Sequence, residues 1–288
     1  MKQLLQIAIN NLPPLPKTAL ELREYLDNTK EIKINEVEKI IKSDPLVFME
    51  LIKLVNSAYY SFQNTINSVS HAISLLGVVN VKNIILINAL RSSFKVDTRP
   101  YGQEIAKFMD YNQQILEFAL LYTREINKQL VNEITPNILL LRIGVIIFSD
   151  ALLKARMENQ FLQAVKQNKG ENIAEIEREF FGIDSNVFLT HILEQWKFDD
   201  KIVGISKFLK EPQNSPKEIQ RLTFIVSAID KLFTLHYELK ANSIIQALEC
   251  LELANQNRID VSKSLFFEKL PQIAKERFND FLKTKNRE

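Results

Sequence analysis

The sequence predicts an all-α protein, a multi-helix bundle, and three observations lead to that prediction. Apolar residues recur at helical spacing in most segments of the 288-residue chain. The strongest hairpin-turn pairs, Asn-Gly, Asp-Gly and Gly-Gly, are absent from the sequence. Helix starts are well marked: Asp44 and Ser215 each precede a proline, and Asn35 with Glu38 forms a capping-box pattern.

In chain order, the pattern predicts a short N-terminal helix, the turn LPPLP, and then helices over 17–27, 35–42, 45–58, 69–76 and 81–94. Gly77 is expected to cap the helix over 69–76. The stretch Lys95–Gly102, with charge, Pro and Gly, is the best internal boundary. Further helices are predicted over 103–128, 136–155, 157–168, 171–180, 185–196, 200–209, 216–240, 243–256 and 271–284.

Two of these helices have almost no polar face and are expected to form the centre of the fold. In PLVFMELIKLV only Glu50 and Lys53 are charged, and in ILLLRIGVIIFSDALL apolar residues surround the helix. Gly144 lies inside the second helix, where glycine costs about 1 kcal/mol relative to alanine. We therefore expect another helix to cross closely at Gly144.

Composition and charge indicate a cytoplasmic protein with neither a nucleic-acid nor a membrane partner. The fractions of hydrophobic (46%) and charged (25%) residues are ordinary, and Cys250 has no partner for an internal disulfide. The formal charge of +2 supplies no strong field for nucleic acid or anionic lipid. The longest apolar run, 138–148, contains Arg142 and falls short of the ~20 residues that span a bilayer.

The common catalytic and binding motifs are missing from the sequence. The six glycines are too far apart for GxGxxG, a Walker loop or GxSxG, and His71, His191 and His236 are too far apart for HExxH. The segments 69–76 and 81–94 could be read as a helix-turn-helix, but the second is rich in isoleucine and leucine. A buried helix is the favoured interpretation of that segment.

Three motifs in order carry a resemblance to a known family. The set LPPLP, IIKSDPLVFMELIKLVNSAYYSF and INSVSHAISLLGVVNVKNIIL resembles the HDOD family, the HD-related output domain of bacterial signalling proteins. Weaker similarity continues through ILLLRIGVIIF and FGIDSNVFLTHILEQW, so the resemblance covers about residues 12–212. The chain 1–288 is interpreted as one all-α HDOD-like unit, with residues 213–288 as a helical C-terminal extension.

The resemblance implies an HD-domain/phosphodiesterase-like bundle with a degenerate metal site. Leu141 and Arg142 stand where an HD enzyme has its His-Asp pair, Tyr111 and Ser185 stand at other histidine positions, and Asp230 matches the final aspartate. One carboxylate beside an arginine is a poor donor set for a divalent ion. We therefore expect no metal, no cofactor and no catalysis.

The resulting hypothesis is a non-enzymatic, regulatory signal-transduction module that acts through protein–protein contacts, with an unknown partner and oligomeric state. One alternative is a receptor for a nucleotide or second messenger in the degenerate pocket, because Arg142 could face a phosphate. A divergent metal-dependent phosphohydrolase is the less favoured alternative, since the sequence has no His/Asp cluster.

Two sites are singled out for testing. The segment NSAYYSF contains Asn56, Ser57, Tyr59, Tyr60 and Phe62, which either stabilise a helix end or form an exposed apolar patch for a partner.

The second site is Arg142, an arginine in the most apolar helix of the chain. It requires a partner from another helix or from solvent. We predict an ion pair with Asp230, the alternatives being Glu117 or solvent.

Overall fold

A computed structural model describes residues 2–12, 14–56, 65–92, 94–235 and 239–285. Throughout these residues the secondary structure is helical, with no β-strand, which confirms the predicted fold class. The N-terminal helices are α1 (Lys2–Asn10), α2 (Lys17–Asn28), α3 (Ile34–Lys42), α4 (Pro45–Val55), α5 (Val69–Leu76) and α6 (Val78–Ser92).

The remaining elements form the central bundle and the extension. A short 3-10 turn (Arg99–Tyr101) precedes α7 (Ile105–Ile126), α8 (Lys128–Leu140), α9 (Ile143–Lys154), α10 (Glu158–Gln167), α11 (Ile173–Phe181), α12 (Ser185–Gln195) and α13 (Asp200–Lys207). A second 3-10 turn (Pro212–Asn214) leads to α14 (Lys217–Leu232), α15 (Ala241–Gln256), α16 (Lys263–Lys269) and α17 (Gln272–Lys285).

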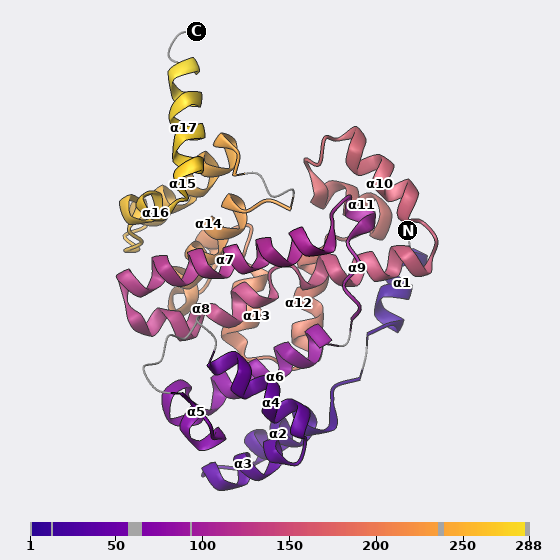
Figure 1. The fold of residues 1–288 in the computed structure, drawn as a ribbon, viewed down its shortest axis with the longest axis vertical. Coiled ribbons are helices and arrows are strands. Elements are labelled where there is room, and N and C mark those ends of the chain that lie inside the picture. Colours follow the sequence, from indigo (N-terminus) through magenta and orange to yellow (C-terminus); the bar gives the residue numbers. More distant parts are fainter. Residues whose placement is uncertain (1, 13, 57–64, 93, 236–238, 286–288) are drawn as a thin grey trace.

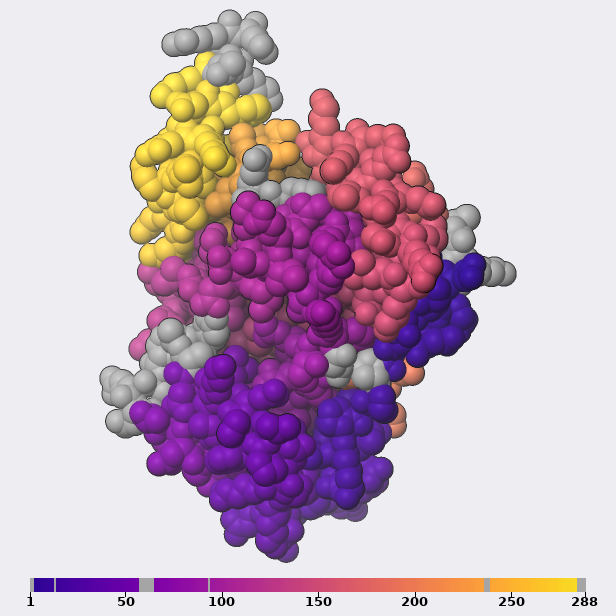
Figure 2. Space-filling view, turned by 45° about the vertical axis from the view of Figure 1, so that its right-hand side comes forward, coloured from indigo at the N-terminus to yellow at the C-terminus, as the bar shows by residue number. Residues whose placement is uncertain are grey.

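The helices pack around two hydrophobic cores. Helices α2–α6 lie together at one end of the molecule, α7 crosses its middle, and α17 projects at the opposite end (Figure 1). The first core joins α1–α6 to α9, α11 and α12, and the second joins α7 and α8 to α14–α16. In the space-filling view helices α2–α6 form a body beneath α7, and α1 lies apart from them against α9 and α11 (Figure 2). We call α2–α6 the N-terminal body and the helices from α7 onward the bundle. The two meet where α4 and α6 face α7, α8 and α9.

The prediction of one continuous helix over 136–155 is wrong, because the structure has two helices here, α8 and α9. Asn127 caps α8 by accepting a hydrogen bond from the Gln129 backbone at 2.9 Å, so the helix starts earlier than predicted. Leu141 and Arg142 form a turn between the two helices. This turn carries Arg142 toward α14, where its guanidinium finds its partners.

The predicted caps have different outcomes. Asp44 caps α4 by accepting hydrogen bonds from the Leu46 and Val47 backbone, as predicted. Asn35 lies inside α3, whose cap position is Lys33, and the Ser215 hydroxyl donates to the Pro212 carbonyl instead of capping α14. The short helix α16 was not predicted, because its seven residues are too few to show a clear period.

One of the two helices expected at the centre of the fold is buried and the other is not. The prediction that neighbouring helices enclose α4 is wrong: only its Leu51 and Val55 are buried, while Leu46 and Met49 are exposed, because α4 packs on one side against α3, α5 and α6. The stretch Lys128–Lys154 is long and apolar enough to cross a membrane, but 72% of its most apolar window is buried, as expected for core helices. Helix α6 is also mostly buried, which agrees with the reading of it as a core helix.

The predicted close crossing at Gly144 is present. A Cβ atom at Gly144 would lie 2.1 Å from the backbone oxygen of Ser185, at the start of α12. Only glycine therefore fits this contact.

Candidate functional site

At the positions that the family resemblance assigns to a degenerate metal site, Arg142 and Asp230 form an ion pair, as predicted. The Arg142 Nη1 lies 2.6 Å from the Asp230 carboxylate, and Nη2 donates to the backbone carbonyl of Phe233. The Arg142 side chain is 13% exposed and that of Asp230 is 32% exposed. Both partners of Arg142 lie at the C-terminal end of α14, so the guanidinium joins the α8–α9 turn to that helix.

Tyr111 lies beside this pair. Its ring packs edge-on against Phe233, with 5.6 Å between the ring centroids. Burial raises the pKa of the Tyr111 phenol well above its usual value, and the nearby positive charge of Arg142 only partly opposes the increase. The phenol is therefore neutral at physiological pH and supplies no anionic ligand for a metal.

The other two predicted positions face different surroundings. Leu141 packs against the second core and lines a small cavity with Asn186 and Leu209. Ser185 lies against Gly144 and donates its backbone N–H to Glu177 at 2.8 Å. The structure thus brings together Tyr111, Arg142 and Asp230, while Leu141 and Ser185 belong to neighbouring contacts.

These residues do not fit a divalent metal. Among the described residues Asp230 is the one carboxylate that pairs with Arg142, and the guanidinium already occupies one of its oxygens. Divalent ions in HD-type sites need several oxygen or imidazole ligands. Nowhere in the described part of the chain do three or more His, Cys, Asp or Glu side chains form a group that could hold a metal ion.

A cavity of about 580 Å³ is lined by Arg142 and by residues of α4 and α6 on one side and of α7, α8 and α9 on the other. Helices α4 and α6 contribute Lys53, Asn88 and Arg91, and α7 contributes Phe108 and Asn112. No sequence pattern groups these residues, because they come from separate helices. The one feature of the sequence that points to this cavity is the pair of charged residues, Glu50 and Lys53, on an otherwise apolar helix.

The Asn56 side chain has a structural role. Its amide donates to the Ile66 carbonyl at 2.5 Å, and its oxygen accepts from the Ile66 backbone N–H at 2.7 Å. Asn56 therefore ties the end of α4 to the chain that leads into α5. The other residues predicted in this motif, Ser57, Tyr59, Tyr60 and Phe62, lie outside the described residues.

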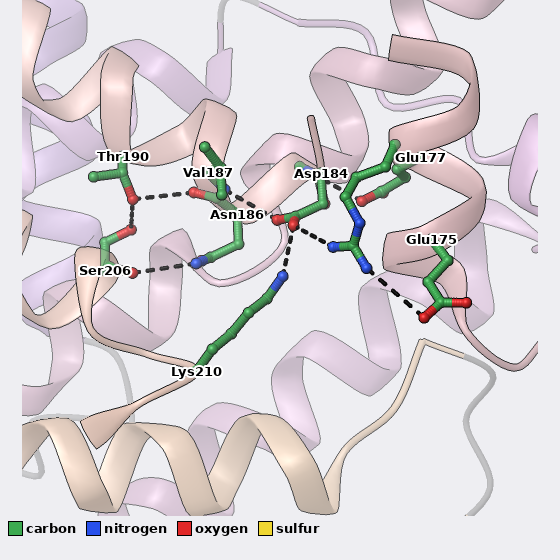
Figure 3. Close-up of polar contacts among 10 residues, drawn as sticks. Glu175, Glu177, Asp184, Asn186, Val187, Thr190, Ser206 and Lys210 are labelled. Atoms are coloured by element: carbon green, nitrogen blue, oxygen red, sulfur yellow. Dashed lines mark hydrogen bonds and ion pairs between the residues drawn. The ribbon is translucent and has the colours of Figure 1, made fainter. Parts of the chain in front are cut away.

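A second charged cluster, which was not predicted, lies where α11, α12 and α13 meet (Figure 3). Asp184 caps α12 through the Val187 backbone and forms ion pairs with Lys210 at 2.6 Å and Arg178 at 2.8 Å. Glu177 is 1% exposed and accepts hydrogen bonds from the Tyr101 hydroxyl and the Ser185 backbone, each at 2.8 Å. Burial raises the pKa of Glu177 to about 7, against the opposing effect of these hydrogen bonds.

Comparison with solved structures gives similar folds over nearly the whole chain. A virulence factor from Campylobacter jejuni subsp. jejuni is 32% identical, with 96% of this chain and 97% of that chain covered and a TM-score of 0.64. A candidate phosphohydrolase from Shewanella amazonensis SB2B is 18% identical over 93% of each chain, with a TM-score of 0.64. A candidate signal transduction protein from Marinobacter aquaeolei VT8 is 18% identical over 96% of this chain and 58% of that chain, with a TM-score of 0.58.

The sequence comparisons agree with the resemblance in the motifs. An uncharacterised protein from Treponema pallidum (strain Nichols) is 26% identical over 77 residues, which span 15% of that protein and 27% of this chain. The HDOD domain matches residues 12–212, well over half of the chain. With this match and an all-α fold shared with the Campylobacter protein, the chain belongs to the HDOD family.

Proposed function

We propose that this HDOD protein is a non-enzymatic bacterial signalling module that acts in the cytoplasm through contacts with another protein. The observation that carries the proposal is the bond between the Arg142 guanidinium and the Asp230 carboxylate. A metal-dependent hydrolase requires that carboxylate as a ligand, and a divalent ion beside the guanidinium would be repelled.

The non-catalytic part of the proposal is tested by metal analysis and a hydrolysis assay. The full chain, purified after growth with added manganese, should contain well under one metal ion per chain and should not hydrolyse bis-p-nitrophenyl phosphate. About one Mn, Fe, Mg or Zn per chain together with turnover of the substrate would overturn it. The Asp230→Asn variant serves as the control, because turnover that persists in it does not come from this site.

The protein-contact part has a candidate surface on α4. Leu46 and Met49 are 67% and 59% exposed and lie three residues apart, hence on one face of the helix. Capture from the native cell should recover a partner with the wild-type chain and lose it with the double variant Leu46→Glu, Met49→Glu. Ile273→Glu on α17, where the side chain is 56% exposed, is the matched control. Recovery of the same proteins by all three chains would contradict this surface.

A further inference from the structure

The cavity between the N-terminal helices and the bundle has the size and polarity of a small-molecule site. Its volume of about 580 Å³ lies within the range of roughly 300–1,000 Å³ that is usual for such sites. Its deepest lining consists of apolar side chains that are themselves buried, namely Phe108, Leu116, Ile138, Ile143 and Ile146. An apolar group therefore has a matching surface at the floor of the cavity.

The charged lining of the cavity is mainly basic. Lys53, Arg91 and Arg142 contribute positive charge, and Glu50 is the one acidic residue among the lining residues described. The Arg142 guanidinium already donates hydrogen bonds to Asp230 and Phe233, so we treat it as part of the cavity wall and not as the group that binds the ligand. Among the described residues Lys53 forms no ion pair, and its exposed side chain stands at the mouth. Basic residues at the mouth and apolar residues at the floor favour a ligand that has both a negative charge and an apolar body.

We propose that this cavity binds a small organic anion with an apolar or aromatic body. Its carboxylate or phosphate pairs with Lys53 and Arg91, and its body lies against Phe108 and the neighbouring apolar floor. A bare inorganic anion would leave that floor uncovered, and a neutral apolar molecule would gain nothing from the basic rim. The ligand lies beside the positions that the family resemblance assigns to a metal, not in them, because the Arg142–Asp230 pair fills those positions.

The position of the cavity gives such a ligand a means of regulation. The lining comes from α4 and α6 in the N-terminal body and from α7, α8 and α9 in the bundle. A bound ligand contacts both bodies at once and stabilises their junction by an amount that grows with its concentration. The surface of α4 that carries Leu46 and Met49 belongs to the same helix as Lys53.

A matched pair of dyes tests the proposed chemistry on the full chain. The dye 8-anilinonaphthalene-1-sulfonate has an aromatic body and a negative charge, and N-phenyl-1-naphthylamine has the same body without the charge. We expect the anionic dye to bind saturably and at least about fivefold more tightly than the neutral dye. Lys53→Gln and Arg91→Gln should each weaken the anionic dye by roughly five- to tenfold and leave the neutral dye unchanged.

Two further variants make the result decisive. Lys107→Gln removes an exposed positive charge from α7 outside the lining and should bind both dyes as the wild type does. Ser92→Trp places a large ring at the mouth and should weaken both dyes. Equal affinity for the two dyes, or identical binding by Lys53→Gln and Lys107→Gln, would overturn the proposal.

Competition then distinguishes the two kinds of anion. Displacement of the anionic dye by octanoate indicates a carboxylate ligand, and displacement by AMP, but not by adenosine, indicates a phosphate. Displacement by neither octanoate nor AMP would contradict the proposal. These outcomes are independent of the protein-contact proposal, whose test uses partner capture and no small molecule.

Discussion

Asp230 and Glu177 are two carboxylates of the bundle that differ in burial and in the charge of their partners. Asp230 on α14 is 32% exposed and has a guanidinium 2.6 Å away. Glu177 on α11 is 1% exposed, and its two close partners are a tyrosine hydroxyl and a backbone N–H. Its neighbour Asp184 takes both nearby cations, Lys210 and Arg178.

The difference shows two ways to accommodate an acid inside a protein. At the α8–α9 turn the carboxylate of Asp230 has a cationic partner, the Arg142 guanidinium. At the α11–α12 junction the buried acid has only neutral hydrogen-bond donors, and burial raises the pKa of Glu177 to about 7. Near neutral pH the Glu177 side chain is therefore protonated in part of the molecules and ionised in the rest.

The largest expected effect comes from Gly144, which lies between the two regions. It follows Arg142 by two residues and touches Ser185, whose backbone donates to Glu177. Gly144→Ala would force a Cβ atom to 2.1 Å from the Ser185 carbonyl, a backbone atom with little freedom to move. We expect a loss of about 3 kcal/mol in the free energy of unfolding, at the upper end of the usual cost of overpacking because the clash is with backbone, measured by urea denaturation.

The matched control for Gly144 is Gly204→Ala. There the new Cβ would meet Ile219 Cδ1 at 2.6 Å, at the end of a flexible side chain that can turn away. The gain in helix propensity, about 1 kcal/mol, offsets part of that clash. A change in stability at Gly144 as small as that at Gly204 would contradict the rigid crossing.

The second prediction concerns the pH dependence that Glu177 contributes. Its folded pKa of about 7 exceeds the usual 4.5, so folding favours the protonated acid. Below pH 4.5 both states are protonated, and from 4.5 to 7 this group reduces stability as the pH rises. The full cost above pH 7 is about 3 kcal/mol.

The test of this prediction is Glu177→Gln, which keeps the shape but cannot ionise. Relative to the wild type, the variant should gain up to about 3 kcal/mol between pH 5 and pH 8, by urea denaturation at both values. Glu175→Gln on the same helix, where the side chain is 69% exposed, should show almost no such change. A stability difference for Glu177→Gln that is the same at both pH values would disprove the buried titration.

The third prediction concerns Arg142. Arg142→Leu leaves the Asp230 carboxylate and the Phe233 carbonyl without their partner, at a cost of about 2 kcal/mol. This is below the ~3–5 kcal/mol for fully buried pairs, because Asp230 is partly exposed and solvent screens its charge.

A double-mutant cycle with Asp230→Asn isolates the pair. We expect a coupling of at least about 1 kcal/mol in the free energy of unfolding, so that the double variant recovers part of the loss. The exposed pair between Lys263 and Glu252 should give less than about 0.5 kcal/mol in the same cycle. Equal coupling in the two pairs would show that the Arg142–Asp230 pair is energetically no different from an ordinary surface ion pair.

The features that could be predicted from the sequence are those that depend on local residue patterns and on the need of a buried charge for a partner. Helical spacing predicted the fold class, and an arginine in an apolar helix needed a distant acid, which the structure shows to be Asp230. The family resemblance assigned Tyr111 and Arg142 to one site, and each contacts Phe233 in the structure.

What could not be predicted depends on long-range contacts. Tyr101 and Glu177 are 76 residues apart, and neither lies in a motif. The break at Leu141 and Arg142 has no helix-breaking residue, so only the bonds from Arg142 to α14 mark it. The cavity joins side chains from separate helices, and its existence depends on how those helices pack.

The smallest effect is expected at Lys210, which shares Asp184 with Arg178. Burial opposes ionisation of Asp184, yet the hydrogen bonds from Lys210, Val187 and Arg178 lower its pKa overall. Lys210 is 51% exposed, so Lys210→Ala should cost only about 0.5–1 kcal/mol, and less in 1 M salt.

The Lys210→Ala variant should also affect Glu177, because the negative charge of Asp184 raises the pKa of Glu177. With Lys210 removed, that charge is less compensated and Glu177 should hold its proton to a higher pH. The pH at which Glu177→Gln gains stability should therefore move upward in the Lys210→Ala background, measured by urea denaturation across pH 5 to 9. An unchanged midpoint would show that Asp184 and Glu177 titrate independently, and that hydrogen bonding and burial alone determine the protonation of Glu177.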